Sequence, residues 1–185
     1  MVFTRKSPSK LLIRALNYIQ KGKALDLGSG NGINSVFLAK KGFTVTAIDN
    51  SKEQITKLTE LSDMENININ INQENIISFK PKEKFDLIIS IATLHFLGKM
   101  EIINLIEKIK NCTDHNGLNV ISAFTDENPK KTFPHLFKKN ELKDFYKDWN
   151  ILYYEEFLGE LEKHDNSDLH KHAFANLIAK KPDFL

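Results

Sequence analysis

The feature that most constrains the fold is a short apolar run that ends in an acidic residue and then opens into three glycines at alternate positions. It occupies residues 24–32 and reads Ala-Leu-Asp-Leu-Gly-Ser-Gly-Asn-Gly. Apolar residues resume at once from Ile33 onward. Because glycine has no Cβ and tolerates a positive φ, such a turn lets backbone N–H groups approach a ligand closely. The pattern predicts a strand, a tight glycine turn and a helix that together hold a nucleotide-like cofactor.

Segments with strand character alternate with segments of helical spacing along the rest of the chain. Strands are predicted over residues 23–27, 43–48, 67–72, 85–90, 118–124, 151–157 and 173–179. Helices are predicted over 9–19, 31–40, 51–61, 100–110 and 140–146. Ser51 is a plausible N-cap, with Gln54 three residues on as in a capping box.

Repeated units of this kind predict an α/β protein with a Rossmann-like, doubly wound sheet that is mostly parallel. The last two of its seven predicted strands are separated only by a loop, residues 159–172, and no helix is predicted between them. A hairpin is therefore expected there. The C-terminal strand is predicted to run antiparallel to the rest of the sheet.

Composition and charge exclude several classes of protein. Hydrophobic residues make up 41% of the chain and charged residues 27%, and 185 residues suit one domain over positions 1–185. The net charge of +2 is too small to favour a nucleic-acid partner. The single cysteine, Cys112, excludes an internal disulfide and a cysteine-rich metal site.

The sequence shows neither a membrane span nor a signal peptide. No apolar run approaches the roughly 18 residues of a membrane span. Residues 1–10 are basic and polar, and they lack the apolar region of a signal peptide. We therefore expect a cytoplasmic protein that binds neither nucleic acid nor membrane, and the sequence leaves its oligomeric state open.

The glycine spacing favours one class of cofactor over another. A dinucleotide fingerprint reads G-x-G-x-x-G, whereas this chain has G-x-G-x-G with Asp26 two residues before the first glycine. A buried carboxylate there would repel a pyrophosphate, but it can orient the loop or accept from an amino group. Asp49 follows the second predicted strand, where an acidic side chain accepts hydrogen bonds from ribose hydroxyls. Asp49 could also simply favour the dipole of the helix that starts near Ser51.

On these residues the chain resembles the class I S-adenosylmethionine-dependent methyltransferases. Their first motif is an acidic residue followed by x-G-x-G-x-G, as in residues 26–32. The resemblance includes Asp49, the segment 73–76 after the third strand, 85–88 opening the fourth strand and 94–97 after it. It also fits an antiparallel last strand.

This resemblance implies S-adenosylmethionine as the cofactor, with S-adenosylhomocysteine as the product. The glycine turn would hold the methionine part and Asp49 the ribose. Asn75 stands where the family often has an Asp facing the adenine amino group, and an Asn carbonyl can still accept that N–H. The cofactor-binding residues that it implies are Asp26, Gly28, Ser29, Gly30, Gly32, Asn34, Asp49, Asn50, Asn75, Ile76 and Ser90.

The C-terminal third resembles a narrower family, the tellurite-resistance methyltransferases. The likeness rests on residues 140–143, Tyr146, Trp149, 159–161 and 174–175. It implies a small methyltransferase that acts on tellurium and selenium oxyanions. The chain departs from that family at Glu162-Lys163, where the family tends to carry His-Arg, and a Glu beside an oxyanion would be repulsive. Groups of the same loop could supply positive charge instead: His164, His170, Lys171 and His172.

His95 is the candidate catalytic residue. It follows the fourth predicted strand, at the edge where open α/β sheets bind ligands, and an imidazole titrates near neutral pH. The alternative is a structural histidine that packs in the turn 94–97 against the next helix. The sequence does not decide between the two.

We interpret two clusters of charged or titratable residues as solvated surface loops rather than as functional sites. His164, His170 and His172 lack the spacing of a zinc site, although His170 and His172 on a strand would share a face. We expect a solvated loop and no metal. A lysine cluster brackets the apolar segment 133–137 and could attract an anionic substrate, but we expect a solvated surface loop there too; it comprises Lys130, Lys131, Lys138 and Lys139.

The expected function is methyl transfer to a small-molecule acceptor, with tellurite- or selenite-type oxyanions or thiols as candidates. A sulfonium is already a strong leaving group, so alignment and exclusion of water supply most of the rate. A general base is needed only if the acceptor carries a proton to be removed. Residues 3–9 and 125–139 are expected to cover the pocket. The alternative is a non-catalytic module that binds S-adenosylmethionine as a sensor or scaffold.

Overall fold

One seven-stranded sheet forms the centre of the molecule, with the strand order β3-β2-β1-β4-β5-β7-β6. The computed structural model describes residues 7–129, 131–159 and 171–183. The strands are β1 Gly22–Leu27, β2 Phe43–Asp49, β3 Asn70–Gln73, β4 Phe85–Ile91, β5 Thr113–Phe124, β6 Asn150–Leu158 and β7 Ala173–Lys180. β7 runs antiparallel to both of its neighbours, β5 and β6, whereas the other pairs of described strands are parallel. The predicted Rossmann-like sheet with an antiparallel C-terminal strand is therefore confirmed.

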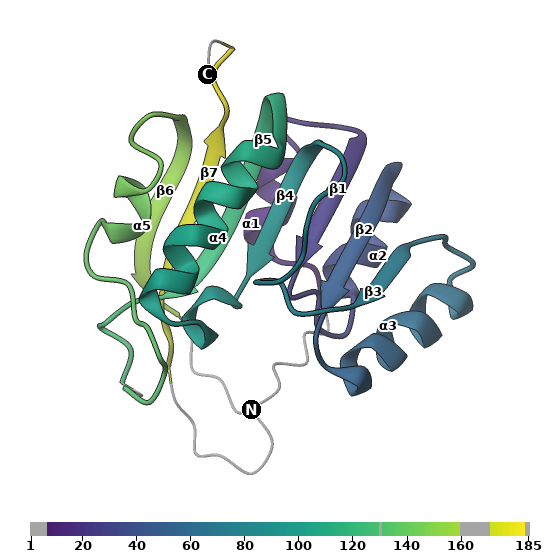
Figure 1. The fold of residues 1–185 in the computed structure, drawn as a ribbon, viewed down its shortest axis with the longest axis horizontal. Helices are drawn as coiled ribbons and strands as arrows, with labels where there is room; N and C mark the ends of the chain where they lie inside the picture. The colour runs from purple at the N-terminus through teal and green to yellow at the C-terminus, as the bar shows by residue number, and fades with distance from the viewer. Residues whose placement is uncertain (1–6, 130, 160–170, 184–185) are drawn as a thin grey trace.

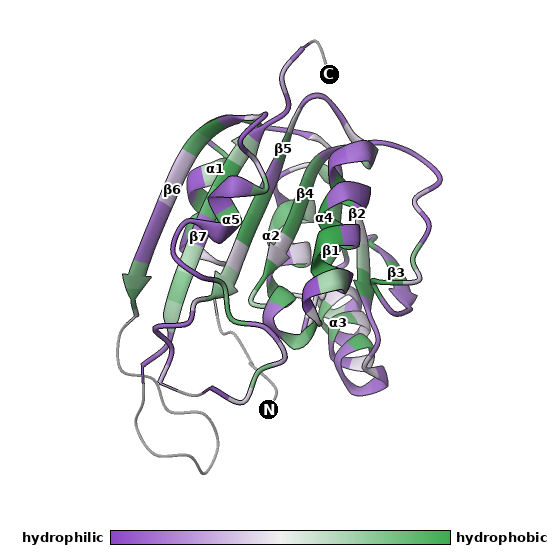
Figure 2. Cartoon of the chain, turned by 60° about the vertical axis from the view of Figure 1, so that its left-hand side comes forward, coloured by the Kyte–Doolittle hydropathy of each residue, from purple (hydrophilic) through white to green (hydrophobic). Residues whose placement is uncertain are grey.

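Helices cover both faces of the sheet (Figure 1). They are α1 Lys10–Ala15, α2 Ile33–Lys40, α3 Lys52–Met64, α4 Lys99–Cys112 and α5 Glu141–Asp144, with a 3₁₀ turn η1 at Leu94–Phe96. The core on one face joins the sheet to α1, α2 and α3, and the core on the other joins it to α4 and α5. Because both faces are covered, the central strands are mostly apolar, as in β4, and Figure 2 shows this against the more hydrophilic outer strand β6.

Two predicted elements are shorter in the structure, and each has a local cause. The third strand begins at Asn70 rather than at Ile67, because Asn66 adopts a φ of 52° and the Ile67 N–H bonds the Ser62 carbonyl. These residues therefore close the C-terminus of α3 before a strand can start. The first helix ends at Ala15 rather than at residue 19. After Ala15 the N–H groups of Asn17 and Tyr18 donate to carbonyls three residues back, as in a 3₁₀ turn, instead of four residues back as in an α-helix.

Asn116-Gly117, a dipeptide typical of turns, lies inside a strand that is longer than the predicted one over residues 118–124. β5 begins at Thr113, which pairs with Phe85, and the register then jumps so that Leu118 pairs with Leu87. The extra residues form a bulge in which Asn116 has a φ of 60°. Asn116 and Gly117 therefore bend one strand instead of separating two elements.

The strand order places a topological switch between β1 and β4. From β1 the chain winds outward through β2 and β3, and from β4 it winds the other way through β5. The chain therefore leaves β1 and β4 in opposite directions at the carboxyl edge, which is where open α/β sheets bind ligands. None of the helices in the described part of the chain is long and apolar enough to cross a membrane.

Candidate cofactor-binding site

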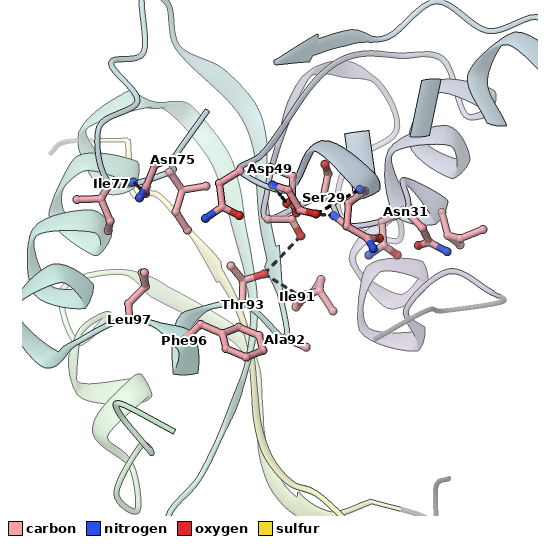
Figure 3. A pocket seen from close by; sticks show the side chains of 18 of the residues that line it. Ser29, Asn31, Asp49, Asn75, Ile77, Ile91, Ala92, Thr93, Phe96 and Leu97 are labelled. Atoms are coloured by element: carbon pink, nitrogen blue, oxygen red, sulfur yellow. Dashed lines mark hydrogen bonds between the residues drawn. The ribbon is translucent and has the colours of Figure 1, made fainter. Parts of the chain in front are cut away.

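A cavity of about 540 Å³ opens at the carboxyl edge of β1, β2, β3 and β4. In Figure 3 the polar side of Ser29 and Asp49 faces the apolar side of Phe96 and Leu97, with Asn75 and Asn31 toward opposite ends. The volume is in the range of cofactor and ligand sites. The lining residues are Gly28, Ser29, Gly30, Asn31, Ile33, Asn34, Asp49, Asn50, Ser51, Gln54, Asn75, Ile76, Ile77, Ile91, Ala92, Thr93, Phe96, Leu97 and Glu101.

The glycine turn is tied to both neighbouring strand ends. The backbone N–H groups of Gly28 and Ser29 donate to the Ile48 carbonyl at 2.8 and 3.0 Å. The Thr93 hydroxyl, after β4, donates to the Gly28 carbonyl at 3.4 Å. A Cβ at Gly28 would lie 2.4 Å from the Thr93 side chain. The first glycine thus lets the loops after β1 and β4 meet at the cavity.

The other two glycines have different roles. Gly30 has a φ of +54°, and among the described residues beyond its two chain neighbours a Cβ there would have only Gln54 Oε1 within 4 Å, at 3.9 Å. Its backbone therefore borders open cavity. Gly32 has a φ of +82°, and its Cβ would lie 2.1 Å from Leu58 Cδ1 of α3. It begins α2 in close contact with α3, so its role is in packing.

Asp49 joins the turn to the start of α3. Its Oδ2 accepts the Gly30 N–H and its Oδ1 accepts the Ser51 N–H, each at 2.9 Å. The Ser51 hydroxyl in turn accepts the Gln54 N–H at 3.4 Å, which confirms the predicted N-cap. A carboxylate has about four lone-pair positions, so each Asp49 oxygen can accept a further hydrogen bond from a ligand.

The loop after β3 forms one end of the cavity. Asn75 Oδ1 accepts the Ile77 N–H at 2.8 Å and so fixes a turn in its own loop. Its carbonyl oxygen keeps a second lone pair and its amide group keeps its donors. Ile76 is buried and lines the cavity beside Ile77. This end therefore combines an apolar wall with one amide.

The segment after β4 forms the wall of the cavity that faces Ser29 and Asp49. Ala92 has a φ of 57°, an unusual conformation for a residue with a Cβ, and its N–H is held by the Ser122 carbonyl at 2.8 Å. This bend leads into Thr93, whose hydroxyl faces Gly28. Phe96 lines the cavity with 45% of its surface exposed.

The structure brings eight of the predicted cofactor residues to the cavity wall: Gly28, Ser29, Gly30, Asn34, Asp49, Asn50, Asn75 and Ile76. Asp26, Gly32 and Ser90 do not line it. Asp26 is buried beneath the turn, where it accepts the Ser35 hydroxyl at 2.6 Å and so orients the first turn of α2. Ser90 is fully buried in β4. Direct contact of these three with a cofactor stays a prediction.

His95 lies in η1, behind the wall that Phe96 presents to the cavity. It is fully buried, and its ring stacks on Phe124 at 3.8 Å between centroids. Burial, and to a lesser extent the charge of His172, lower the pKa of His95 to about 3. The imidazole is therefore neutral near pH 7 and a weak base. Its catalytic role stays a prediction, and its placement matches the structural alternative.

Two of the three late histidines, His164 and His170, lie outside the described residues. Glu162 and Lys163 lie outside them too. For His172 the expected solvated loop is wrong. Its ring is fully buried, stacks on Phe124 at 4.5 Å between centroids, and shares a 3.1 Å hydrogen bond with Asn128. The aromatic neighbour from β5 draws it into the molecule.

The expected covers of the pocket are seen in part. Ser9 donates its N–H to Asn34 Oδ1 at 3.0 Å, so the segment before α1 reaches a lining residue. Residues 3–6 lie outside the described chain. No described residue of 125–139 lines the cavity, but Phe133 packs edge-on against Phe96 at 5.7 Å between centroids. Lys138 and Lys139 are exposed, and Phe137 anchors their loop in the core.

Several lining residues had no role in the sequence-based site. Gln54 was noted only as part of a helix start, yet its position one turn into α3 brings it to the glycine turn. Thr93, Phe96 and Leu97 follow β4 at the same edge. Their common signal is position: each stands within a few residues of a strand's carboxyl end or a helix start at that edge.

Comparisons with known proteins agree with this arrangement. The family profile described as Tellurite resistance protein TehB matches residues 5–178. A probable S-adenosyl-L-methionine-dependent methyltransferase TehB of Haemophilus influenzae is 37% identical over 174 residues, which cover 92% of this chain and 61% of the relative. The chain thus spans about three fifths of the length of this relative.

Solved structures give the same picture. The crystal structure of TehB from Haemophilus influenzae superposes with a TM-score of 0.88 at 35% identity, covering 96% of this chain and 63% of that chain. An S-adenosylmethionine-dependent methyltransferase from Clostridium acetobutylicum superposes with a TM-score of 0.72 at 14% identity, covering 97% and 93%. The second likeness is one of fold alone, and it is the Rossmann-like methyltransferase fold.

Proposed function

Because the chain belongs to the tellurite resistance protein TehB family, we propose that it binds S-adenosylmethionine in the glycine-turn cavity and transfers the methyl group to a small-molecule acceptor. The observation that carries the proposal is the convergence of three features on one cavity. They are an open backbone at Gly30, the Asp49 carboxylate with free acceptor capacity, and an apolar end around Ile76.

The residues present fit the parts of this cofactor. Gly30 lets a ligand approach the backbone, and the buried Ser29 hydroxyl has no partner among the described residues and lines the cavity. We assign the methionine part to this turn. Asp49 would accept the ribose hydroxyls, and Asn75, Ile76 and Asn50 would surround the adenine.

The chain's contribution to methyl transfer is alignment. When bound, S-adenosylmethionine would supply an activated methyl group that an acceptor's lone pair can take. The turn fixed by Ile48 and the wall fixed through Ala92 hold the two sides of the cavity in place. Holding both reactants in line and away from water is worth up to about 7–11 kcal/mol of the barrier. An acceptor without a proton to lose needs no base.

Tellurite- or selenite-type oxyanions and thiols are the acceptors that we propose to test first. The family description supports the oxyanions, since the matching profile is described by tellurite resistance. The weakly basic, fully buried His95 supports acceptors that attack through a lone pair and need no base. Thiolates meet this requirement as well as reduced tellurium or selenium.

A sensor or scaffold that binds S-adenosylmethionine without turnover is the second candidate. It is favoured by one observation: His95, the candidate general base, is not among the residues that line the cavity. The two candidates differ in one measurement, which is the consumption of bound S-adenosylmethionine in the presence of an acceptor.

The experiment combines binding with product analysis. Calorimetry with S-adenosylmethionine and S-adenosylhomocysteine is expected to show one site per chain. Mass spectrometry on a panel of thiols, selenite, tellurite and small amines should then show a methylated product together with S-adenosylhomocysteine. Binding without turnover on any acceptor would leave the sensor as the better description, and absence of binding would refute both.

A further inference from the structure

Gln54 is a buried amide that faces the cavity without a hydrogen-bond partner. It lies in the first turn of α3 and is only 4% exposed. Neither its Oε1 nor its Nε2 has a partner among the described residues, and the side chain lines the cavity. A buried polar group left unpaired is destabilising, so a residue of this kind at a cavity wall indicates that a ligand completes its bonds.

The neighbours of Gln54 place it beside Asp49 and Gly30. Its backbone N–H is held by the Ser51 hydroxyl, and the Ser51 N–H is held by Asp49 Oδ1. Its Oε1 lies 3.9 Å from a Cβ built on Gly30, whose N–H donates to Asp49 Oδ2. The amide and the carboxylate therefore border the same part of the cavity.

Amide and carboxylate are complementary toward hydroxyl groups. The Asp49 carboxylate only accepts hydrogen bonds, so a hydroxyl that donates to it is left with lone pairs that need a donor. Gln54 Nε2 offers that donor, and Oε1 can accept from a second hydroxyl. A pair of adjacent hydroxyls satisfies both side chains at once, whereas a single charged group would satisfy only one.

We propose that Gln54 is a second ligand of the ribose diol, acting with Asp49 to recognise the adenosyl group. The inference rests on the proposed function, since the diol is that of S-adenosylmethionine. Gln54 is a binding residue for the cofactor and takes no part in breaking or forming the methyl bond. It makes the cavity selective for an intact 2′,3′-diol.

The proposal has a consequence that a structural role would not have. Gln54→Met keeps the length and helix propensity of the side chain and removes the unpaired amide. The protein alone should become as stable as the wild type or more so, because a buried unsatisfied group is lost. Binding of an adenosyl ligand should become weaker. A residue needed only for folding would shift stability downward instead.

The experiment uses the full chain and S-adenosylhomocysteine, together with its 2′-deoxy and 3′-deoxy forms, as calorimetric probes. Gln54→Met should weaken S-adenosylhomocysteine binding about tenfold, the value of one hydrogen bond of about 1.4 kcal/mol. The loss should shrink to about twofold or less for the deoxy form that lacks the hydroxyl held by Gln54. Gln20→Met is the matched control, because Gln20 is exposed and precedes β1 at the opposite edge of the sheet. It should leave all three affinities unchanged.

Two results would overturn the inference: wild-type affinity for S-adenosylhomocysteine in Gln54→Met, or an equal loss for all three probes. A fall in thermal stability without ligand would also count against it. Gln54→Ala is a second variant for the same binding test and should show the same differences among the three probes. If the wild-type chain binds none of the probes, the proposed function fails first, and that outcome is distinct from the others.

Discussion

Gly30 and Gly32 offer a matched pair of substitutions that separates ligand contact from folding within one turn. Both have left-handed backbones, with φ of +54° and +82°, so alanine carries a backbone penalty of about 1–2 kcal/mol at either position. The space for the added methyl differs. A Cβ on Gly30 would lie 3.9 Å from Gln54 Oε1, whereas a Cβ on Gly32 would lie 2.1 Å from Leu58 Cδ1.

These distances predict opposite rankings for stability and for binding. Gly30→Ala should lower the free energy of unfolding by the backbone penalty alone, about 1–2 kcal/mol. Gly32→Ala must also displace the fully buried Leu58, which costs a further 1–3 kcal/mol or about 2–5 kcal/mol in all. A methyl at position 30 instead projects into the cavity. It should weaken S-adenosylhomocysteine binding roughly 5- to 150-fold, the equivalent of about 1–3 kcal/mol.

Urea unfolding followed by circular dichroism measures the stability of each variant, and calorimetric titration of the folded protein measures its affinity for S-adenosylhomocysteine. We expect Gly32→Ala to unfold at the lower urea concentration and Gly30→Ala to bind the more weakly. Wild-type affinity in Gly30→Ala would refute the assignment of the turn to the cofactor. Equal unfolding midpoints for the two variants would refute the packing argument at Leu58.

Three further predictions concern single side chains. Asp49→Ala should weaken S-adenosylmethionine binding by about 1–3 kcal/mol in calorimetry, because the ribose hydroxyls lose their acceptor; unchanged binding would remove Asp49 from the site. In the folded wild type the pKa of His95 is about 3, whereas in the unfolded chain the imidazole takes up a proton near pH 6.5. The stability that the neutral His95 contributes is therefore present above pH 6.5 and is lost as the pH falls toward 3. Between pH 7 and pH 5, the free energy of unfolding measured in urea titrations should therefore fall by about 2 kcal/mol less in His95→Phe than in the wild type. Equal decreases in the two proteins would contradict this. Lys181 donates to the Lys110 and Thr113 carbonyls at the end of α4, so Lys181→Met should lower the free energy of unfolding by about 1–3 kcal/mol and leave S-adenosylhomocysteine affinity unchanged; an unaltered urea midpoint would show that the cap is not stabilising.

Most of the fold could be predicted because its signals are local. Strand and helix periods are properties of neighbouring residues, and they placed all seven strands and the antiparallel last one. The errors lie at boundaries where a second interaction competes. Ile67 has the alternation of a strand, but its N–H closes α3. Asn116 and Gly117 have the chemistry of a turn, but the strand continues through them as a bulge.

The candidate site divides in the same way. Residues that directly follow a strand, such as Gly28, Asp49 and Asn75, could be predicted because the carboxyl ends of parallel strands meet at one edge. Gln54 could not, since its role depends on how α3 packs against the glycine turn. His95 follows a strand too, yet Phe124 from the next strand stacks on its ring and buries it.

By itself the sequence determines the succession of strands and helices, the glycine turn and the acidic residue that follows the second strand. These features depend on backbone conformation and on periodicity, which a chain carries along its own length. Only the tertiary structure decides which side chains share a wall, because that depends on contacts between segments far apart in sequence. Asp26 beneath the turn, His95 behind the wall and Gln54 inside the cavity are three polar residues whose surroundings were settled in this way.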